Sequence, residues 1–204
     1  DVNSHGIKSP MKPITTASIL AGGMSRRMGF NKAFIKVGGQ SIIERSLKTL
    51  RSVFEEVNII ADDIALYGNL GAVVWPDAVK KAGSLGGLYT ALLHCTGDRV
   101  FVTACDMPAV EAASVKRTVE LFTDGDAAVP FIGGRFHPMH AVYAKSCVKP
   151  IEEMIRAGNL RINSLLDRIK VQKLTEDAYN GLAIAASVTN INTKEDLSKA
   201  GIEI

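Results

Sequence analysis

Two patterns of apolar residues alternate along this chain. Short continuous apolar runs are typical of buried strands, whereas apolar residues that recur every three or four positions are typical of amphipathic helices. The runs that predict strands are residues 15–20, 57–61, 72–75, 99–104, 126–131, 137–143, 170–174 and 185–189. The stretches that predict helices are residues 41–54, 87–95, 109–122, 147–157, 161–169 and a last one from Thr193. Strands that alternate with helices predict an α/β fold, with a mostly parallel sheet and helices on both of its faces.

Local signals refine this pattern. Ser41 and Glu44 form the S-x-x-E capping box of a helix that starts there. Gly133–Gly134 predicts a tight hairpin turn, so an antiparallel excursion is expected near residues 126–143. No repeat or long linker divides the pattern, and residues 14–204 are predicted to form one domain. Residues 1–13 begin with "DVNSHGIKSP", which is unlike the rest, and are predicted to be a cloning remnant or a disordered N-terminus.

Composition narrows the class of protein. The chain is 47% hydrophobic and 22% charged, and its net charge of +3 is too small to indicate a nucleic-acid partner. No apolar run approaches the ~18 residues of a membrane span, and no signal-peptide pattern is present. The three cysteines are odd in number and form no C-x-x-C, so neither a disulfide framework nor a zinc site is indicated. A cytoplasmic protein that binds neither nucleic acid nor membrane is expected.

The first predicted strand runs into a glycine-rich, cationic loop. In "ILAGGMSRRMGFNKAF" (19–34), glycines stand among Arg26, Arg27 and Lys32. Glycine lets backbone N–H groups approach phosphate oxygens closely, and such concave loops bind anions. The spacing matches neither a Walker P-loop nor G-x-G-x-x-G. On these residues alone, a phosphate-binding loop and an ordinary solvated loop both remain possible.

Acidic and amide residues follow other predicted strands. Asp77 follows residues 72–75, Asp106 follows residues 99–104, and Asn190 and Asn192 follow residues 185–189. Ligands of such sheets bind beyond the carboxyl ends of the strands. Basic residues after one strand and acids after its neighbours suit a nucleoside triphosphate with a divalent metal. A single aspartate in such a place is otherwise more often a helix cap or a turn residue.

The opening loop resembles the signature L-A-G-G-x-S-x-R-M-G-x-D-K of molybdenum cofactor guanylyltransferases and their nucleotidyltransferase relatives. The matching positions are Leu20, Ala21, Gly22, Gly23, Ser25, Arg27, Met28, Gly29 and Lys32. Asn31 departs from it, because the signature has aspartate there. Further segments resemble the family in chain order: "VVWPD" with "GSLGGLYTAL", "FVTACDMP", "HPMHAVY" and "VTNINTKEDL". The resemblance implies a single-domain, Rossmann-like nucleotidyltransferase fold.

The resemblance also implies a role for individual residues. The residues implied to bind the nucleotide are Leu20, Ala21, Gly22, Gly23, Lys32, Asp77 and Asp106. Those implied to be catalytic are Arg27, Lys32 and Asp106, and those implied to ligate Mg²⁺ are Asp106 and Asn192, with Asn190 as the alternative amide. A helix is implied to begin at Gly86–Gly87, against the ligand.

The residues that would contact the acceptor, the molecule to which the nucleotide is transferred, are less defined. His137 and His140 are interpreted as structural or acceptor-contacting. Arg161, Asn163 and Arg168 are expected on an exposed helix, where they face either solvent or an anionic pterin.

The reaction implied is transfer of GMP from GTP to molybdopterin or molybdenum-molybdopterin, with release of pyrophosphate. Transient contacts with proteins that deliver and accept the cofactor are implied as well. Two alternatives stay open. One is an enzyme of the same fold with another nucleotide, such as a cytidylyltransferase. The other is a non-catalytic nucleotide-binding protein, which Asn31 favours and which Lys32, Asp77 and Asp106 oppose.

Overall fold

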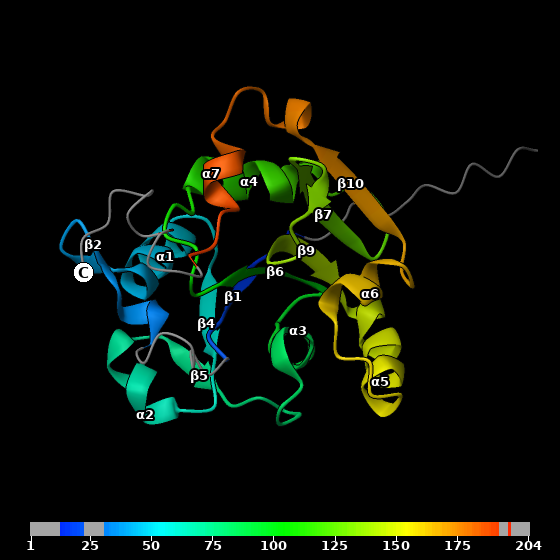
Figure 1. Ribbon diagram of the computed structural model, residues 1–204, viewed down its shortest axis with the longest axis horizontal. Coiled ribbons are helices and arrows are strands. Elements are labelled where there is room, and N and C mark those ends of the chain that lie inside the picture. Colours follow the sequence, from blue (N-terminus) through cyan, green and yellow to red (C-terminus); the bar gives the residue numbers. More distant parts are fainter. Residues whose placement is uncertain (1–12, 23–30, 192–195, 197–204) are drawn as a thin grey trace, which may run out of the picture.

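The computed structural model describes residues 13–22, 31–191 and 196 (Figure 1). Within them, eight strands form one sheet in the order β10-β7-β9-β6-β1-β4-β5, with β8 paired to β7. The strands are β1 (Thr16–Leu20), β4 (Glu56–Ile60), β5 (Val73–Trp75), β6 (Arg99–Ala104), β7 (Ala127–Ile132), β8 (Arg135–Phe136), β9 (His140–Ala144) and β10 (Val171–Thr175). A separate hairpin pairs β2 (Lys36–Val37) with β3 (Gln40–Ser41). The prediction of a mostly parallel α/β sheet is confirmed.

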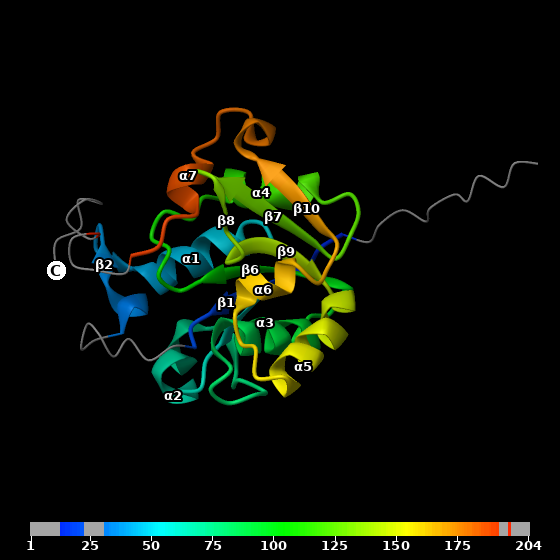
Figure 2. The ribbon, with the colours of Figure 1, turned by 45° about the vertical axis from the view of Figure 1, so that its right-hand side comes forward.

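Helices cover both faces of the sheet (Figures 1 and 2). One face carries α1 (Ile42–Arg51), α4 (Ala112–Leu121) and α7 (Ile184–Ser187), and the other carries α3 (Gly83–His94), α5 (Val148–Arg156) and α6 (Ile162–Leu166). The shorter elements are α2 (Ile64–Tyr67) beside β5, and the 3-10 turns η1 (Lys32–Phe34), η2 (Gly68–Leu70), η3 (Lys145–Cys147) and η4 (Glu176–Tyr179). Each face buries its own hydrophobic cluster, so the sheet is the middle layer of three. Among the described residues, no helix is long and apolar enough to cross a bilayer.

The start of α1 matches its predicted capping box. The backbone N–H of Ser41 donates to Glu44 Oε2 at 2.8 Å, and the Ser41 hydroxyl accepts from the Glu44 N–H at 3.4 Å. These two bonds provide acceptors for N–H groups at the start of the helix, which have no carbonyl partner within the helix itself. The apolar side of the helix, including Ile43, Leu47 and Leu50, is buried against the sheet.

The predicted antiparallel segment is also present, but its strands have different bounds. Gly133 and Gly134 have φ of 57° and 77°, as a two-residue hairpin turn requires, and they join β7 to the short β8. The predicted strand 137–143 is split, because the N–H of His140 bonds to the carbonyl of His137 and closes a turn there. β9 then begins at His140 and runs antiparallel between β6 and β7.

Two further expectations are wrong. The predicted strand 185–189 is the helix α7 and the residues after it, because Ser187 and Val188 bond back to the carbonyls of Ala183 and Ile184. The predicted helix 161–169 shortens to α6. The helix expected from Thr193 and the segment 1–12 lie outside the described residues.

The helix implied to begin at Gly86–Gly87 begins earlier, at Gly83. Gly86 and Gly87 lie inside α3, where they allow the helix to approach its neighbours. A Cβ on Gly87 would stand 3.3 Å from the Leu20 side chain, and one on Gly86 would stand 2.7 Å from the Cβ of Ala82. Gly87 therefore lets α3 pack closely against the end of β1, whereas Gly86 leaves room for Ala82 and the chain before the helix.

Candidate active site

The carboxyl ends of β1, β4, β5 and β6 meet at one edge of the sheet. Backbone bonds continue the ladders one residue beyond the strands: Cys105 N–H donates to Leu20 O at 3.2 Å, and Ala21 N–H donates to Ile60 O at 2.8 Å. On the next pair, Ala61 N–H donates to Trp75 O at 2.9 Å. The loops that carry Gly22, Asp77 and Asp106 therefore start side by side.

Gly22 lies directly against the carboxylate of Asp77. A Cβ on Gly22 would stand 2.8 Å from Asp77 Oδ2, closer than a carbon atom can come. The other oxygen, Oδ1, is buried and has no hydrogen-bond partner among the described residues. Burial raises the pKa of Asp77, and the nearby Asp62 adds to the effect, whereas Lys80 opposes it. The carboxylate is thus an acceptor held beside the end of β1 and available to a ligand.

Lys32 and Asp106 form an ion pair at the same edge. Lys32 Nζ lies 3.5 Å from Asp106 Oδ2, and the two side chains are 16% and 19% exposed. Within the part of the chain that the structure describes, Asp106 Oδ1 is buried without a hydrogen-bond partner. Burial raises the pKa of Asp106, and Lys32 opposes that shift. A cation and a carboxylate therefore lie side by side in a site that is largely shielded from solvent.

Asn31, which departs from the signature, has a structural role. Its side-chain oxygen accepts from the Ala33 N–H at 3.0 Å and caps η1, which begins at Lys32. Its amide nitrogen donates to the Tyr67 hydroxyl at 2.8 Å. Burial raises the pKa of Tyr67 to about 12, so the phenol is neutral and can accept that bond. Asn31 thereby anchors the turn that positions Lys32.

The cysteine beside Asp106 favours its neutral thiol form. Burial, reinforced by the Asp106 carboxylate, raises the pKa of Cys105 to about 12. The nucleophilic form of cysteine is the thiolate, which is scarce at neutral pH when the pKa is this high. Cys105 is therefore not suited to covalent catalysis.

The site can provide a ligand for Mg²⁺. The described residues hold no cluster of three or more histidine, cysteine or acidic side chains that could bind a metal. Mg²⁺ does not require one, because it keeps several waters and binds through one or two carboxylates plus substrate phosphates. Oδ1 of Asp106, which is buried and has no partner in the described segments, is a hard oxygen of the kind that Mg²⁺ binds.

A large open cavity of about 1130 Å³ adjoins this edge at Met107. Its walls come from β8 and the turn after it, from α6, and from the chain after α7. Its lining includes Arg135, Phe136, His137, Arg161, Asn163 and Asn190, together with the acidic residues Asp167 and Asp196. Ile191 N–H donates to Asp106 O at 2.9 Å, which holds the segment with Asn190 beside Asp106 although no strand precedes it.

The remaining predicted residues separate into three groups. His137 lines the cavity, whereas His140 is fully buried under α4, edge-on to Phe101 at 5.1 Å, with burial lowering its pKa to about 3. Arg168 is exposed and is not among the cavity's lining residues. Gly23, Arg27 and Asn192 lie outside the described residues.

Arg135 and Phe136 were missed by the sequence analysis. The signal that could have identified them is the glycine turn at 133–134, since a hairpin after β7 returns the next residues to this edge.

Comparisons with known proteins agree on one family. A family model described as the MobA-like NTP transferase domain matches residues 17–174. A protein of Pelotomaculum thermopropionicum named "Probable molybdenum cofactor guanylyltransferase" is 37% identical over 189 residues, which is 92% of each chain. One of Desulfosudis oleivorans named "Molybdenum cofactor guanylyltransferase" is 34% identical over 91% of this chain and 93% of its own. The crystal structure of molybdopterin-guanine dinucleotide biosynthesis protein A from Archaeoglobus fulgidus has a TM-score of 0.78 at 28% identity, covering 91% of this chain and 96% of that one.

Proposed function

This chain belongs to the MobA-like NTP transferase family, and we propose that it transfers GMP from GTP to the phosphate of molybdopterin, with or without molybdenum. The products are the guanine dinucleotide form of the cofactor and pyrophosphate. One observation carries the proposal: the Lys32–Asp106 pair lies at the carboxyl edge of the sheet, next in sequence to Met107, which lines the 1130 Å³ cavity. The names of the relatives favour guanine and a molybdenum cofactor.

The nucleotide half of the site would bind GTP by its sugar, base and phosphates. The backbone of Leu20, Ala21 and Gly22 would approach the nucleotide, and Asp77 would accept a hydrogen bond from it. Lys32 would neutralise the β- and γ-phosphates, together with Arg27 from the signature. Asp77 and Asp106 each have a buried oxygen for which the described residues offer no partner, which supports a ligand on this edge.

The reaction requires positioning rather than a protein nucleophile. A phosphate oxygen of the acceptor attacks the α-phosphorus of GTP, the bond to the bridging β-phosphate oxygen breaks, and pyrophosphate leaves. The residues contribute by aligning the two anions and countering the developing charge. Asp106 would hold Mg²⁺, with Asn190 or Asn192 as a further ligand, and the bound ion would supply charge neutralisation on the triphosphate. Lys32 would stabilise the departing pyrophosphate.

The acceptor half would be the cavity. Its volume is adequate for an organic molecule of the size of a pterin. Arg135 and Arg161 could pair with the acceptor phosphate, because guanidinium groups match phosphate oxygens in geometry. Asn163 and Asn190 could hydrogen bond to the heterocycle. The open mouth would also be the place where proteins that deliver or accept the cofactor make transient contact.

We expect Gly22→Ala to weaken GTP binding about tenfold, roughly the value of one hydrogen bond to a charged group. The new methyl group would displace the Asp77 carboxylate, which is only 2.8 Å from the Cβ position. Because that carboxylate is the end of a flexible side chain, the fold should persist. Calorimetric titration with GTP measures the effect.

The matched control is Gly68→Ala. Gly68 has an ordinary φ of −61° and no heavy atom within 4 Å of its Cβ position. The Gly68→Ala substitution should leave the affinity for GTP unchanged. Equal affinity of the Gly22→Ala and Gly68→Ala variants would remove Asp77 from the nucleotide site.

Nucleotide selectivity tests the proposal as a whole. We expect titration of the full chain with GTP, CTP, ATP and UTP in Mg²⁺ to show GTP bound at least about tenfold more tightly than the others, a difference of ~1.4 kcal/mol. A preference for CTP would keep the mechanism and identify a cytidylyltransferase. Binding of none of the four would refute a nucleotide-dependent function.

A further inference from the structure

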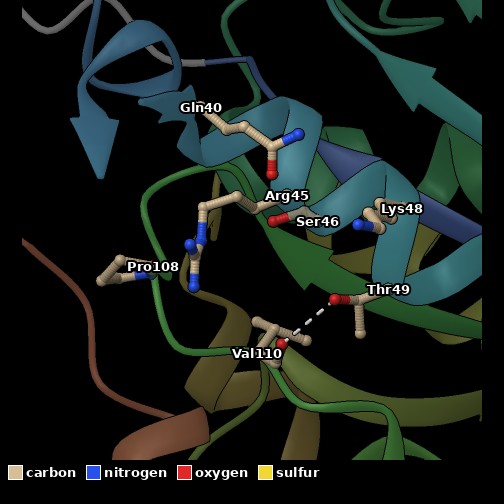
Figure 3. Close-up of a pocket in the computed structure, with 7 residues that line it drawn as sticks. All are labelled: Gln40, Arg45, Ser46, Lys48, Thr49, Pro108 and Val110. Carbon is tan, nitrogen blue, oxygen red and sulfur yellow. Dashed lines mark hydrogen bonds between the residues drawn. The ribbon is translucent and has the colours of Figure 1, made fainter. Parts of the chain in front are cut away.

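A second, smaller pocket lies on the other side of the loop that carries Asp106. It lies between α1 and residues 108–110, and its volume is about 190 Å³ (Figure 3). Its lining residues are Gln40, Arg45, Ser46, Lys48, Thr49, Pro108 and Val110, none of which lines the large cavity. The pocket is therefore separate from the candidate active site, although the loop with Pro108 connects the two.

The lining is cationic and polar. Arg45 and Lys48 supply two positive charges, and two hydroxyl groups and one amide add hydrogen-bonding capacity. Of the residues that the structure describes, no acidic one lines the pocket. The nearest carboxylate along α1, that of Glu44, is engaged by Ser41 at the helix cap. The electrostatics of the pocket thus favour an anion.

Arg45 has unused hydrogen-bonding capacity. Its Nε is buried and finds no partner among residues 13–22, 31–191 and 196, and one terminal nitrogen makes a long bond of 3.4 Å to Val37 O. Figure 3 shows its guanidinium group reaching from α1 towards Pro108 and Val110. Buried donors without acceptors are costly, and a guanidinium is well matched to the oxygens of phosphate.

The size of the pocket limits the ligand. Sites for organic ligands are usually about 300–1,000 Å³, so this pocket is too small for a nucleotide or a pterin. We propose that it binds a small phosphate oxyanion, either inorganic phosphate or pyrophosphate, held by Arg45 and Lys48. This is a binding site additional to the proposed function, and it does not depend on which nucleotide the active site takes.

A bound anion would connect α1 to the loop of Asp106. Thr49 Oγ1 already donates to Val110 O across the pocket, at 3.4 Å, and Pro108 is the second residue after Asp106. An oxyanion that bonds to Arg45 would add a second link between the same two elements. Binding should therefore stabilise the fold as well as occupy the pocket.

The test is titration of the full chain with phosphate and, separately, with pyrophosphate, in the absence of nucleotide and Mg²⁺. Ionic strength is held constant with chloride, so that general screening does not contribute. Calorimetry gives the affinity, and the thermal midpoint gives a second measure. We expect Arg45→Met to weaken phosphate binding by about tenfold or more, the loss expected for hydrogen bonds to a charged group. The phosphate affinity of Arg45→Lys should lie between that of Arg45→Met and that of the unmodified chain. Lys48→Met changes an exposed position and should weaken phosphate binding without affecting the fold.

One comparison separates this pocket from other anion sites. Lys116→Met removes an exposed charge from the neighbouring helix α4 and should bind phosphate as the unmodified chain does. A loss of phosphate binding in Lys116→Met equal to that in Arg45→Met, or unchanged binding in both Arg45→Met and Lys48→Met, would overturn the proposal. Tighter binding of pyrophosphate than of phosphate through Arg45 would identify the product of the proposed reaction as the ligand; the reverse would identify free phosphate.

Discussion

Asp106→Asn is expected to lower the rate of Mg²⁺-dependent GMP transfer by about 10²–10³-fold, a typical loss when one charge-stabilising group is removed. The amide keeps the shape of the side chain and loses the charge that would hold the metal. It also ends the ion pair with Lys32 at 3.5 Å. Because burial already disfavours the charged form of Asp106, the neutral amide should leave the thermal midpoint of unfolding nearly unchanged.

Turnover at saturating GTP and Mg²⁺ measures this effect, with unfolding followed in parallel. Asp177→Asn is the matched control, because Asp177 is an exposed acid on η4, outside the site. It should retain full activity. Turnover by Asp106→Asn equal to that of the control would exclude Asp106 from the metal site.

Lys32→Ala is expected to weaken GTP binding by about 10–100-fold and GMP binding by no more than about threefold, because charge-assisted bonds to the β- and γ-phosphates are lost while the α-phosphate contacts remain. The η1 turn should persist, since Asn31 caps it and bonds to Tyr67 independently of the lysine side chain. Titrations with GTP, GDP and GMP measure the dependence on phosphate number.

Lys36→Ala provides the comparison for Lys32. Lys36 is exposed on β2, four residues further along the chain, and its removal tests for a nonspecific effect of net charge. Its affinities for the three nucleotides should be unchanged. A Lys32→Ala variant that loses equal affinity for GTP and GMP would contradict a role for this lysine at the outer phosphates.

Much of the fold can be predicted from local patterns of the sequence. The strands β1 and β6 are short, rich in apolar residues and buried along their whole length, and the capping box at Ser41 sets the start of α1. The failure at residues 185–189 has a physical reason. A short apolar run rich in alanine fits a buried strand and a helix equally well, and only the tertiary context decides between them.

The candidate site was predictable in part, for a related reason. Asp77 and Asp106 follow strands, so their placement at one edge follows from parallel pairing. The consequence of Asn31 depends on Tyr67, which lies 36 residues away, and no local pattern specifies that contact. The large cavity likewise requires β8, α6 and the chain after α7 to converge, and the pocket at Arg45 requires α1 to meet the loop after β6.

The most direct test of the proposed reaction follows the α-phosphate of GTP. The full chain would be incubated with Mg²⁺, molybdopterin and GTP labelled at either the α- or the γ-phosphate, and the products separated. We expect the α-label to appear in a pterin dinucleotide and the γ-label in pyrophosphate, in equal amounts, with CTP reacting at least about tenfold more slowly. Label that stays in GTP, or transfer that occurs from CTP and not from GTP, would contradict the proposal that this protein is a molybdopterin guanylyltransferase.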